Sequence, residues 1–66
     1  MSKIITAIYE SETTVTNAFD DLISAGIPQE KIRTDKDKRQ VQVASPDTSQ
    51  AEITEILRRH QPTKLH

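Results

Sequence analysis

A stripe of apolar residues that ends in a sharp stop constrains this chain more than any other feature. In the stretch SETTVTNAFDDLISAGIP, apolar side chains recur with the period of an α-helix, at Val15, Ala18, Phe19, Leu22 and Ile23. Ser11 or Thr13 can accept hydrogen bonds from the free amides of the first turn. Gly26 suits the left-handed residue that ends a helix, and Pro28 cannot continue one. The pattern predicts a helix near residues 12–25.

Three other segments have the composition or the alternation of β-strands. The first, KIITAIY near residues 3–9, carries apolar side chains on both faces: Ile4 and Ile8 on one, Ile5, Ala7 and Tyr9 on the other. Such a strand belongs in the centre of a sheet. Two more strands, near residues 31–35 and 39–44, flank the charged turn KDK and form a hairpin. Valines alternate with glutamines in its second strand, so one face is buried and one is wet.

A second helix is expected near residues 48–60. Its buried stripe consists of Ile53, Ile56, Leu57 and His60. The candidate caps are Asp47, Thr48 and Ser49. Ser49 and Glu52 have the spacing of a capping box. Pro62 ends the helix, and the remaining TKLH is long enough only for a short edge strand.

The order of elements is therefore βαββα, with a short fourth strand at the end. Two helices that each follow a strand, with a hairpin between the halves, fit a right-handed split βαβ arrangement. We expect an α+β protein of the ferredoxin-like class, with one domain over residues 1–66, an antiparallel sheet and both helices on one face. One set of apolar side chains from the first strand would then lie on the open face of the sheet.

Much of this pattern resembles the small general-stress, or heat-induced stress, protein domains. In ITAIYESETTVTNAFDDLISAGIPQEKI, the matching residues are Ala18, Leu22, Ala25, Gly26, Ile27, Pro28 and Ile32. ITEILRRHQP resembles the second helix of these domains, which often ends in Leu-Arg-Arg-His followed by Gly; here Gln61 stands in the place of that Gly. The resemblance implies a ferredoxin-like fold and a link to stress. It provides no catalytic residue to transfer to this chain.

The chain is small for a stable core. With 66 residues it buries about 60% of the surface that its unfolded form exposes, and such a core supplies roughly 3–5 kcal/mol. It has no Cys for a disulfide or a thiolate metal site, and its two His residues cannot complete a tetrahedral one. We therefore expect no metal and no cofactor. Self-association is the expected source of additional stability, which predicts a homodimer.

The sequence also gives an expectation for location. The beginning, MSKIITAIYES, does not resemble a signal peptide. No segment approaches the roughly 20 apolar residues of a membrane span. We expect a cytoplasmic protein with no membrane partner.

The sequence offers no set of residues for catalysis. Its single Gly excludes a glycine-rich phosphate loop. Asp20 and Asp21 are adjacent on a helix, so their side chains diverge and are expected on a solvated face. His60 is expected to be a half-buried packing residue near a helix end, and Tyr9 to pack rather than to stack on bases. Because no nucleophile, base and orienting group can be named, the chain is predicted not to be an enzyme.

Charge is unevenly distributed along the chain. Residues 1–30 contain one Lys and five acidic residues, a net charge of −4, whereas residues 31–66 contain eight Lys or Arg and five acidic residues, a net charge of +3. The hairpin concentrates the basic residues Arg33, Lys36, Lys38 and Arg39. Four cations could hold a phosphate backbone. Asp35 and Asp37 alternate with them, however, and charges on a hairpin also prevent edge-to-edge aggregation, so nucleic-acid binding is a lesser alternative.

Two functional classes remain. In the first, the chain is a non-enzymatic interaction module with a link to stress, which acts as a homodimer or binds a macromolecular partner such as another protein. Its candidate contact residues are Ile4, Ile5, Ile8, Tyr9, Arg33, Lys36, Lys38 and Arg39. Either Ile4 and Ile8 or Ile5 and Tyr9 would face the partner. In the second class, the chain is a small-ligand regulatory domain like the amino-acid sensors, but its loop ESETT lacks the Gly that lets a backbone approach a ligand.

Overall fold

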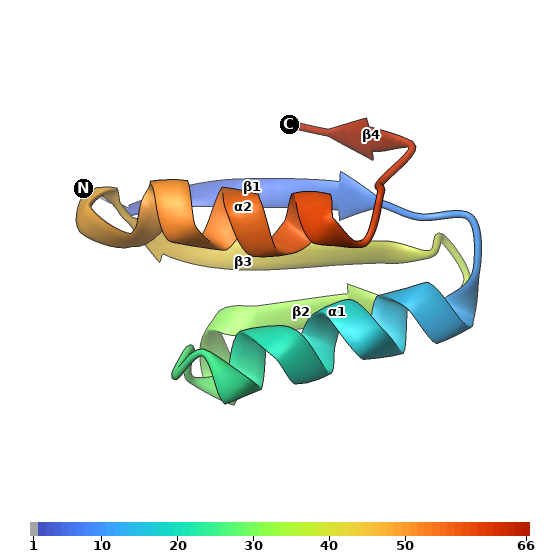
Figure 1. The fold of residues 1–66 in the computed structure, drawn as a ribbon, viewed down its shortest axis with the longest axis horizontal. Helices are drawn as coiled ribbons and strands as arrows, with labels where there is room; N and C mark the ends of the chain where they lie inside the picture. Colours follow the sequence, from blue (N-terminus) through green and yellow to red (C-terminus); the bar gives the residue numbers. More distant parts are fainter. Residues whose placement is uncertain (1) are drawn as a thin grey trace.

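The computed structural model describes residues 2–66 and has an α+β architecture (Figure 1). Its helices and strands, in chain order, are β1 (Ser2–Ile8), α1 (Glu12–Ser24), β2 (Ile32–Asp35), β3 (Gln40–Pro46), α2 (Gln50–Arg59) and β4 (Lys64–Leu65). Short 3-10 turns precede β2 and α2, at Gln29–Lys31 and Asp47–Ser49. The predicted helices and strands are confirmed, with bounds that differ by at most two residues.

The four strands form one antiparallel sheet in the order β2-β3-β1-β4. The two central strands pair along their whole length, from Ser2 opposite Pro46 to Ile8 opposite Gln40. β2 pairs with the outer side of β3, and β4 with the outer side of β1. The first strand is therefore central, and the terminal TKLH supplies a short edge strand, as the sequence predicts.

Helix α1 begins and ends as the sequence predicts. The side chain of Ser11 caps its first turn. At the other end Gly26 has a φ of +95°, in the left-handed region. The N–H of Gly26 donates to the carbonyl of Ile23 and the N–H of Ile27 to the carbonyl of Leu22, both at 3.0 Å. These two bonds define a Schellman motif, and the Ile27 side chain packs back onto the core.

Helix α2 is capped differently from the prediction. Ser49 occupies the N-cap position with a φ of −110° and a ψ of 0°, and its side chain makes no capping hydrogen bond. The predicted capping box of Ser49 and Glu52 is wrong, because the 3-10 turn before α2 keeps Ser49 out of the extended conformation that a cap requires. The side chain of Asp47 lies outside the described part of the structure. At the other end, Gln61 is left-handed, with a φ of +55°, and its N–H donates to the carbonyl of Arg58.

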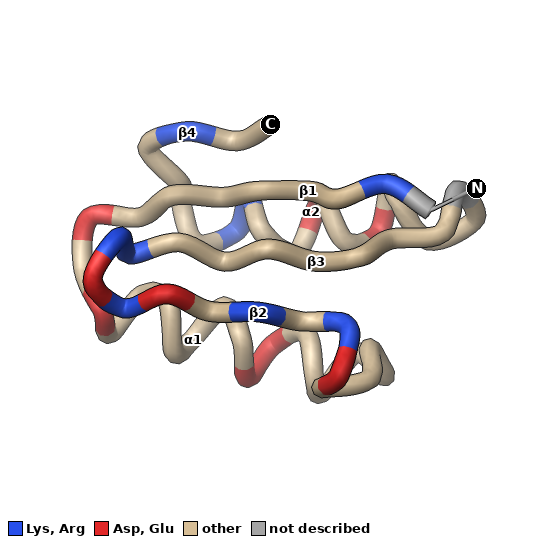
Figure 2. Tube along the Cα trace, turned by 180° about the vertical axis from the view of Figure 1, so that it is seen from behind, with Lys and Arg blue, Asp and Glu red and all other residues tan. Residues whose placement is uncertain are grey.

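Both helices cover the same face of the sheet, and the reverse view shows the strands in front of them (Figures 1 and 2). The core lies between these layers and consists of Ile5, Ala7, Tyr9, Val15, Ala18, Leu22, Ile32, Val41, Val43, Ile53, Ile56 and Leu57. No helix of residues 2–66 covers the opposite side, which we call the open face. By the alternation of strand residues it comprises Ile4, Thr6 and Ile8 of β1, Gln40, Gln42 and Ala44 of β3, Arg33 and Asp35 of β2, and Lys64 of β4.

Candidate functional site

The open face contains an exposed apolar side chain, Ile4, on the central strand β1. Ile4 is 55% exposed, whereas its neighbour Ile5 is 4% exposed. Ile4 lies opposite Ala44 of β3, and Ile8 is half-buried farther along the same face. Of the two alternatives that the sequence left open, Ile4 and Ile8 therefore face outward. Ile5 and Tyr9 lie in the core and are not available to a partner.

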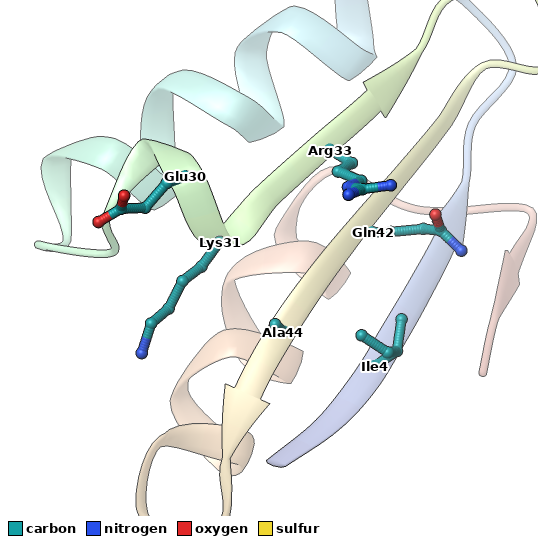
Figure 3. Close-up of a pocket in the computed structure, with 6 residues that line it drawn as sticks. All are labelled: Ile4, Glu30, Lys31, Arg33, Gln42 and Ala44. Carbon is teal, nitrogen blue, oxygen red and sulfur yellow. The ribbon is translucent and has the colours of Figure 1, made fainter.

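Ile4 also borders a shallow hollow of about 320 Å³ on the open face (Figure 3). The hollow is lined by Ile4, Glu30, Lys31, Arg33, Gln42 and Ala44. Arg33 and Gln42 extend over the sheet, whereas Glu30 and Lys31 extend from the turn before β2. Two apolar residues thus lie beside charges of both signs. This mixture suits contact with a protein surface, which is itself part apolar and part polar.

Tyr9 is a structural residue. It is 1% exposed, and its hydroxyl donates a hydrogen bond of 2.8 Å to the carbonyl of Leu57 in α2. Burial raises the pKa of Tyr9 to about 12, because an ionised phenol would be poorly solvated there. The predicted packing role is confirmed, and the ring is not placed to stack on a base.

The structure separates the basic residues of the hairpin. Arg33 lies on β2, where its side chain belongs to the open face, whereas Lys36, Lys38 and Arg39 belong to the tip. Acidic and basic positions alternate around this tip (Figure 2). Asp35 is part of the turn, because its Oδ1 accepts a hydrogen bond from the N–H of Lys38 at 3.2 Å. The alternation weakens the local positive field that a phosphate backbone would require.

A contact between the two helices was not expected from the sequence. The Nε2 of His60 lies 2.8 Å from the Oδ2 of Asp21. His60 is half-buried as predicted, and Asp20 is exposed as predicted, but Asp21 is half-buried and paired rather than solvated. Both helices pack on one face and their C-terminal halves meet, which brings these two side chains together. His60 on the apolar stripe of α2 was the one signal of this contact in the sequence.

Within residues 2–66, no group of three or more His, Cys, Asp or Glu side chains is placed to hold a metal ion. No helix in that range is long and apolar enough to cross a membrane. Comparison of the chain with protein families, curated proteins and solved structures gave no significant match.

Proposed function

We propose that this chain is a small non-enzymatic interaction module with a ferredoxin-like fold, and that it acts as a homodimer or binds a macromolecular partner through the open face. The strand order supports the fold. β1 and β2 run parallel with β3 between them and are joined by α1, which makes one split βαβ unit. β3, α2 and β4 make a second unit around β1.

One observation carries the proposed binding role: an apolar side chain of a central strand, Ile4, is 55% exposed. Apolar groups on a central strand normally contribute to a core, and here the helices cover only the opposite face. Ile4 lies next to Ala44, and the polar and charged side chains of Glu30, Lys31, Arg33 and Gln42 border the same hollow on the β2 side. An apolar centre with a polar rim is the composition of a protein contact surface.

The remaining parts of the proposal depend on the sequence alone. The resemblance to stress-protein domains supports a role under stress, and a cytoplasmic location is part of the same proposal. A small-ligand domain is a weaker candidate, because the loop ESETT has no Gly that would let the backbone approach a ligand. A nucleic-acid module is weaker still, because acidic residues interrupt the basic hairpin.

Two isoleucine variants test the proposed binding surface. Ile4 and Ile23 are both exposed, at 55% and 39%, but Ile23 lies on α1 and not on the open face. We expect Ile4→Lys to release proteins that co-purify with the wild-type chain from its native host, as identified by mass spectrometry, and Ile23→Lys to retain them. Sedimentation equilibrium of the same variants measures self-association. If Ile4→Lys keeps every partner and the wild-type self-association, the open face is not the binding surface.

A further inference from the structure

The outer side of β2 is a free strand edge, since no strand within residues 2–66 pairs with it. The N–H of Tyr9 donates to the carbonyl of Arg39, so the odd-numbered residues of β3 exchange hydrogen bonds with β1. The even-numbered residues of β3 then bond to β2, where Gln42 lies opposite Arg33. The backbone groups of Arg33 therefore point towards β3, and those of Thr34 point outward.

The free edge is accessible from both sides at Thr34. On the open face, Thr34 borders a hollow of about 220 Å³ together with Gln42. On the helix-covered side it borders one of about 280 Å³ together with Val15 and Phe19 of α1. Thr34 itself is exposed. An exposed strand edge of this kind can accept another strand by backbone hydrogen bonds.

The charges of β2 select one antiparallel register for a second copy of the same strand. Residues whose backbone N–H and C=O groups point out of the edge must lie opposite residues of the partner whose backbone groups also point out of its edge. When Thr34 lies opposite the partner's Thr34, Arg33 lies opposite the partner's Asp35, and the symmetric pair forms as well. If the partner strand shifts by two residues in one direction, Arg33 lies opposite the partner's Arg33. If it shifts by two residues in the other direction, Asp35 lies opposite the partner's Asp35. Like charges directly opposite destabilise a strand pair. Of these three registers, only the one centred on Thr34 places no like charges opposite each other.

The local geometry suits these charge pairs. They occupy non-hydrogen-bonded positions, where opposite side chains lie closest. Asp35 uses Oδ1 for the N–H of Lys38, and its Oδ2 is left for the partner's Arg33. The flanks continue the pattern, because the stretch EKIRTDKDK has opposite charges at equal distances from its central Thr: Glu30 with Lys38 and Lys31 with Asp37. These flanking residues lie in the turns at the two ends of β2 and not in the strand itself.

From these observations we infer that a second copy of this chain pairs antiparallel with β2 about Thr34 and forms a continuous sheet of eight strands. The inference rests on the proposed function, in which the chain acts as a homodimer, and names the surface that makes the dimer. The two-fold axis is perpendicular to the sheet, so both open faces lie on one side. Ile4 of each copy then remains accessible to a macromolecular partner, and α1 lies beside the partner's α1 on the other side.

Charges on an edge strand also have a protective use, because they can prevent unwanted pairing. Charges of a single sign would repel a second copy of the strand in every register. β2 instead carries Arg33 and Asp35, one of each sign, at equal distances from Thr34. This arrangement opposes only unlike charges in the register centred on Thr34, whereas each of the two neighbouring registers opposes one like pair.

A charge-swap experiment tests the pairing. In a homodimer, Arg33→Asp and Asp35→Arg each place like charges opposite one another at both positions. We expect sedimentation equilibrium to show the dimer Kd of each variant raised about tenfold or more. An equimolar mixture of the two variants recovers the wild-type Kd, because every opposed pair in the mixed dimer is again of opposite sign. Arg58→Asp, on the exposed side of α2 and away from both β2 and the open face, is the matched control and leaves Kd unchanged. Thermal melting confirms that each variant is folded.

The other outcomes separate the inference from the proposed function. A wild-type Kd for both single variants, or no recovery in the mixture, overturns the β2 pairing. If only Ile4→Lys dissociates the dimer, the second copy lies on the open face, which overturns the inference and supports the proposed function. A wild-type particle that remains at 7.5 kDa at every concentration overturns both the pairing and the homodimer.

Discussion

The two faces of the sheet are built from alternate residues of the same strands and differ in what covers them. Ile4 and Ile5 are adjacent and chemically identical, yet they are 55% and 4% exposed. In β3, Val43 is fully buried, whereas its neighbour Gln42 is only half-buried on the open face. The packing of the helices, rather than residue type, therefore decides which side chains of β1 stabilise the fold. One strand thus separates the core on one face from the proposed binding surface on the other.

The largest expected effect compares the two isoleucines directly. Ile5→Ala removes buried methyl and methylene groups and leaves a cavity, so we expect it to lower the free energy of unfolding by about 2–4 kcal/mol. Ile4→Ala changes an exposed side chain, and we expect it to shift the free energy of unfolding by less than about 0.5 kcal/mol. Urea unfolding followed by circular dichroism measures both. If Ile5→Ala is unfolded, Ile5→Val provides a smaller step of about 1 kcal/mol. Equal losses at both positions would contradict the separation of the faces.

The covered face also depends on the turn that returns the chain from α1 to β2. Gly26→Val is expected to lower the free energy of unfolding by about 1–2 kcal/mol, because a β-branched residue is strained at a φ of +95°. A Cβ at this position would meet no atom within 4 Å, so the loss comes from the backbone and not from a clash. Gly26→Asn is the control and should lose less, since Asn tolerates the left-handed region. A melting temperature unchanged in Gly26→Val would disprove this explanation.

Tyr9 joins the end of β1 to α2, and its hydroxyl can be removed without changing the ring. Tyr9→Phe deletes the hydrogen bond to the carbonyl of Leu57 and is expected to lower the free energy of unfolding by about 1 kcal/mol. That carbonyl retains the N–H of His60 as a donor, which limits the loss. Urea unfolding at neutral pH measures the difference. A loss as large as that of Ile5→Ala would mean that the ring has also moved.

The same residue makes the stability depend on alkaline pH. The pKa of Tyr9 rises from 10.0 to about 12 on burial, so the unfolded chain releases this proton at lower pH than the folded one. The contribution of the buried Tyr9 phenol to the free energy of unfolding is constant below pH 10.0 and is lost as pH rises from there to about 12. The free energy of unfolding of Tyr9→Phe should not show this decline between pH 10.0 and about 12. Because Tyr9 is the only Tyr, phenolate absorbance of the folded protein should have its midpoint near pH 12.

The smallest expected effect concerns the contact between the two helices that form the covering layer. Asp21 and His60 are both partly exposed, so solvent weakens their interaction. A double-mutant cycle with Asp21→Asn and His60→Gln should give a coupling of about 0.5 kcal/mol. Exposed Asp20→Asn is the matched control and should show no coupling with His60→Gln. A zero coupling for Asp21 would mean that apolar contacts alone hold the helices together.

Local signals in the sequence were sufficient to predict the elements and the two sets of residues on β1. The 3.6-residue stripe of α1 and the Gly-Ile-Pro stop depend only on neighbouring residues, which is why Gly26 could be assigned a left-handed conformation in advance. Alternation on β1 likewise separated Ile4 from Ile5. It did not say which of them is covered, because that depends on which side of the sheet receives the helices.

Features that depend on distant residues or on the detail of a turn were harder to predict. The Asp21–His60 pair joins residues 39 positions apart and requires both helices to be in place. The capping box of α2 failed because a 3-10 turn, absent from the predicted elements, changed the backbone of Ser49. Gln61 shows an intermediate case: its φ of +55° lies in the left-handed region that Gly adopts most easily, although the residue is not Gly.

The brevity of β4 limits how far such a sheet can grow. β4 contains only Lys64 and Leu65, so its outer side offers too few backbone groups for a further strand, and an edge Lys discourages one. Polymerisation into a fibre requires two different surfaces that both accept a neighbour, whereas a single self-complementary surface closes on itself. In the dimer inferred above, β2 would be the only edge within residues 2–66 long enough to pair, so addition would stop at two copies and no second edge of the described strands would let a filament elongate.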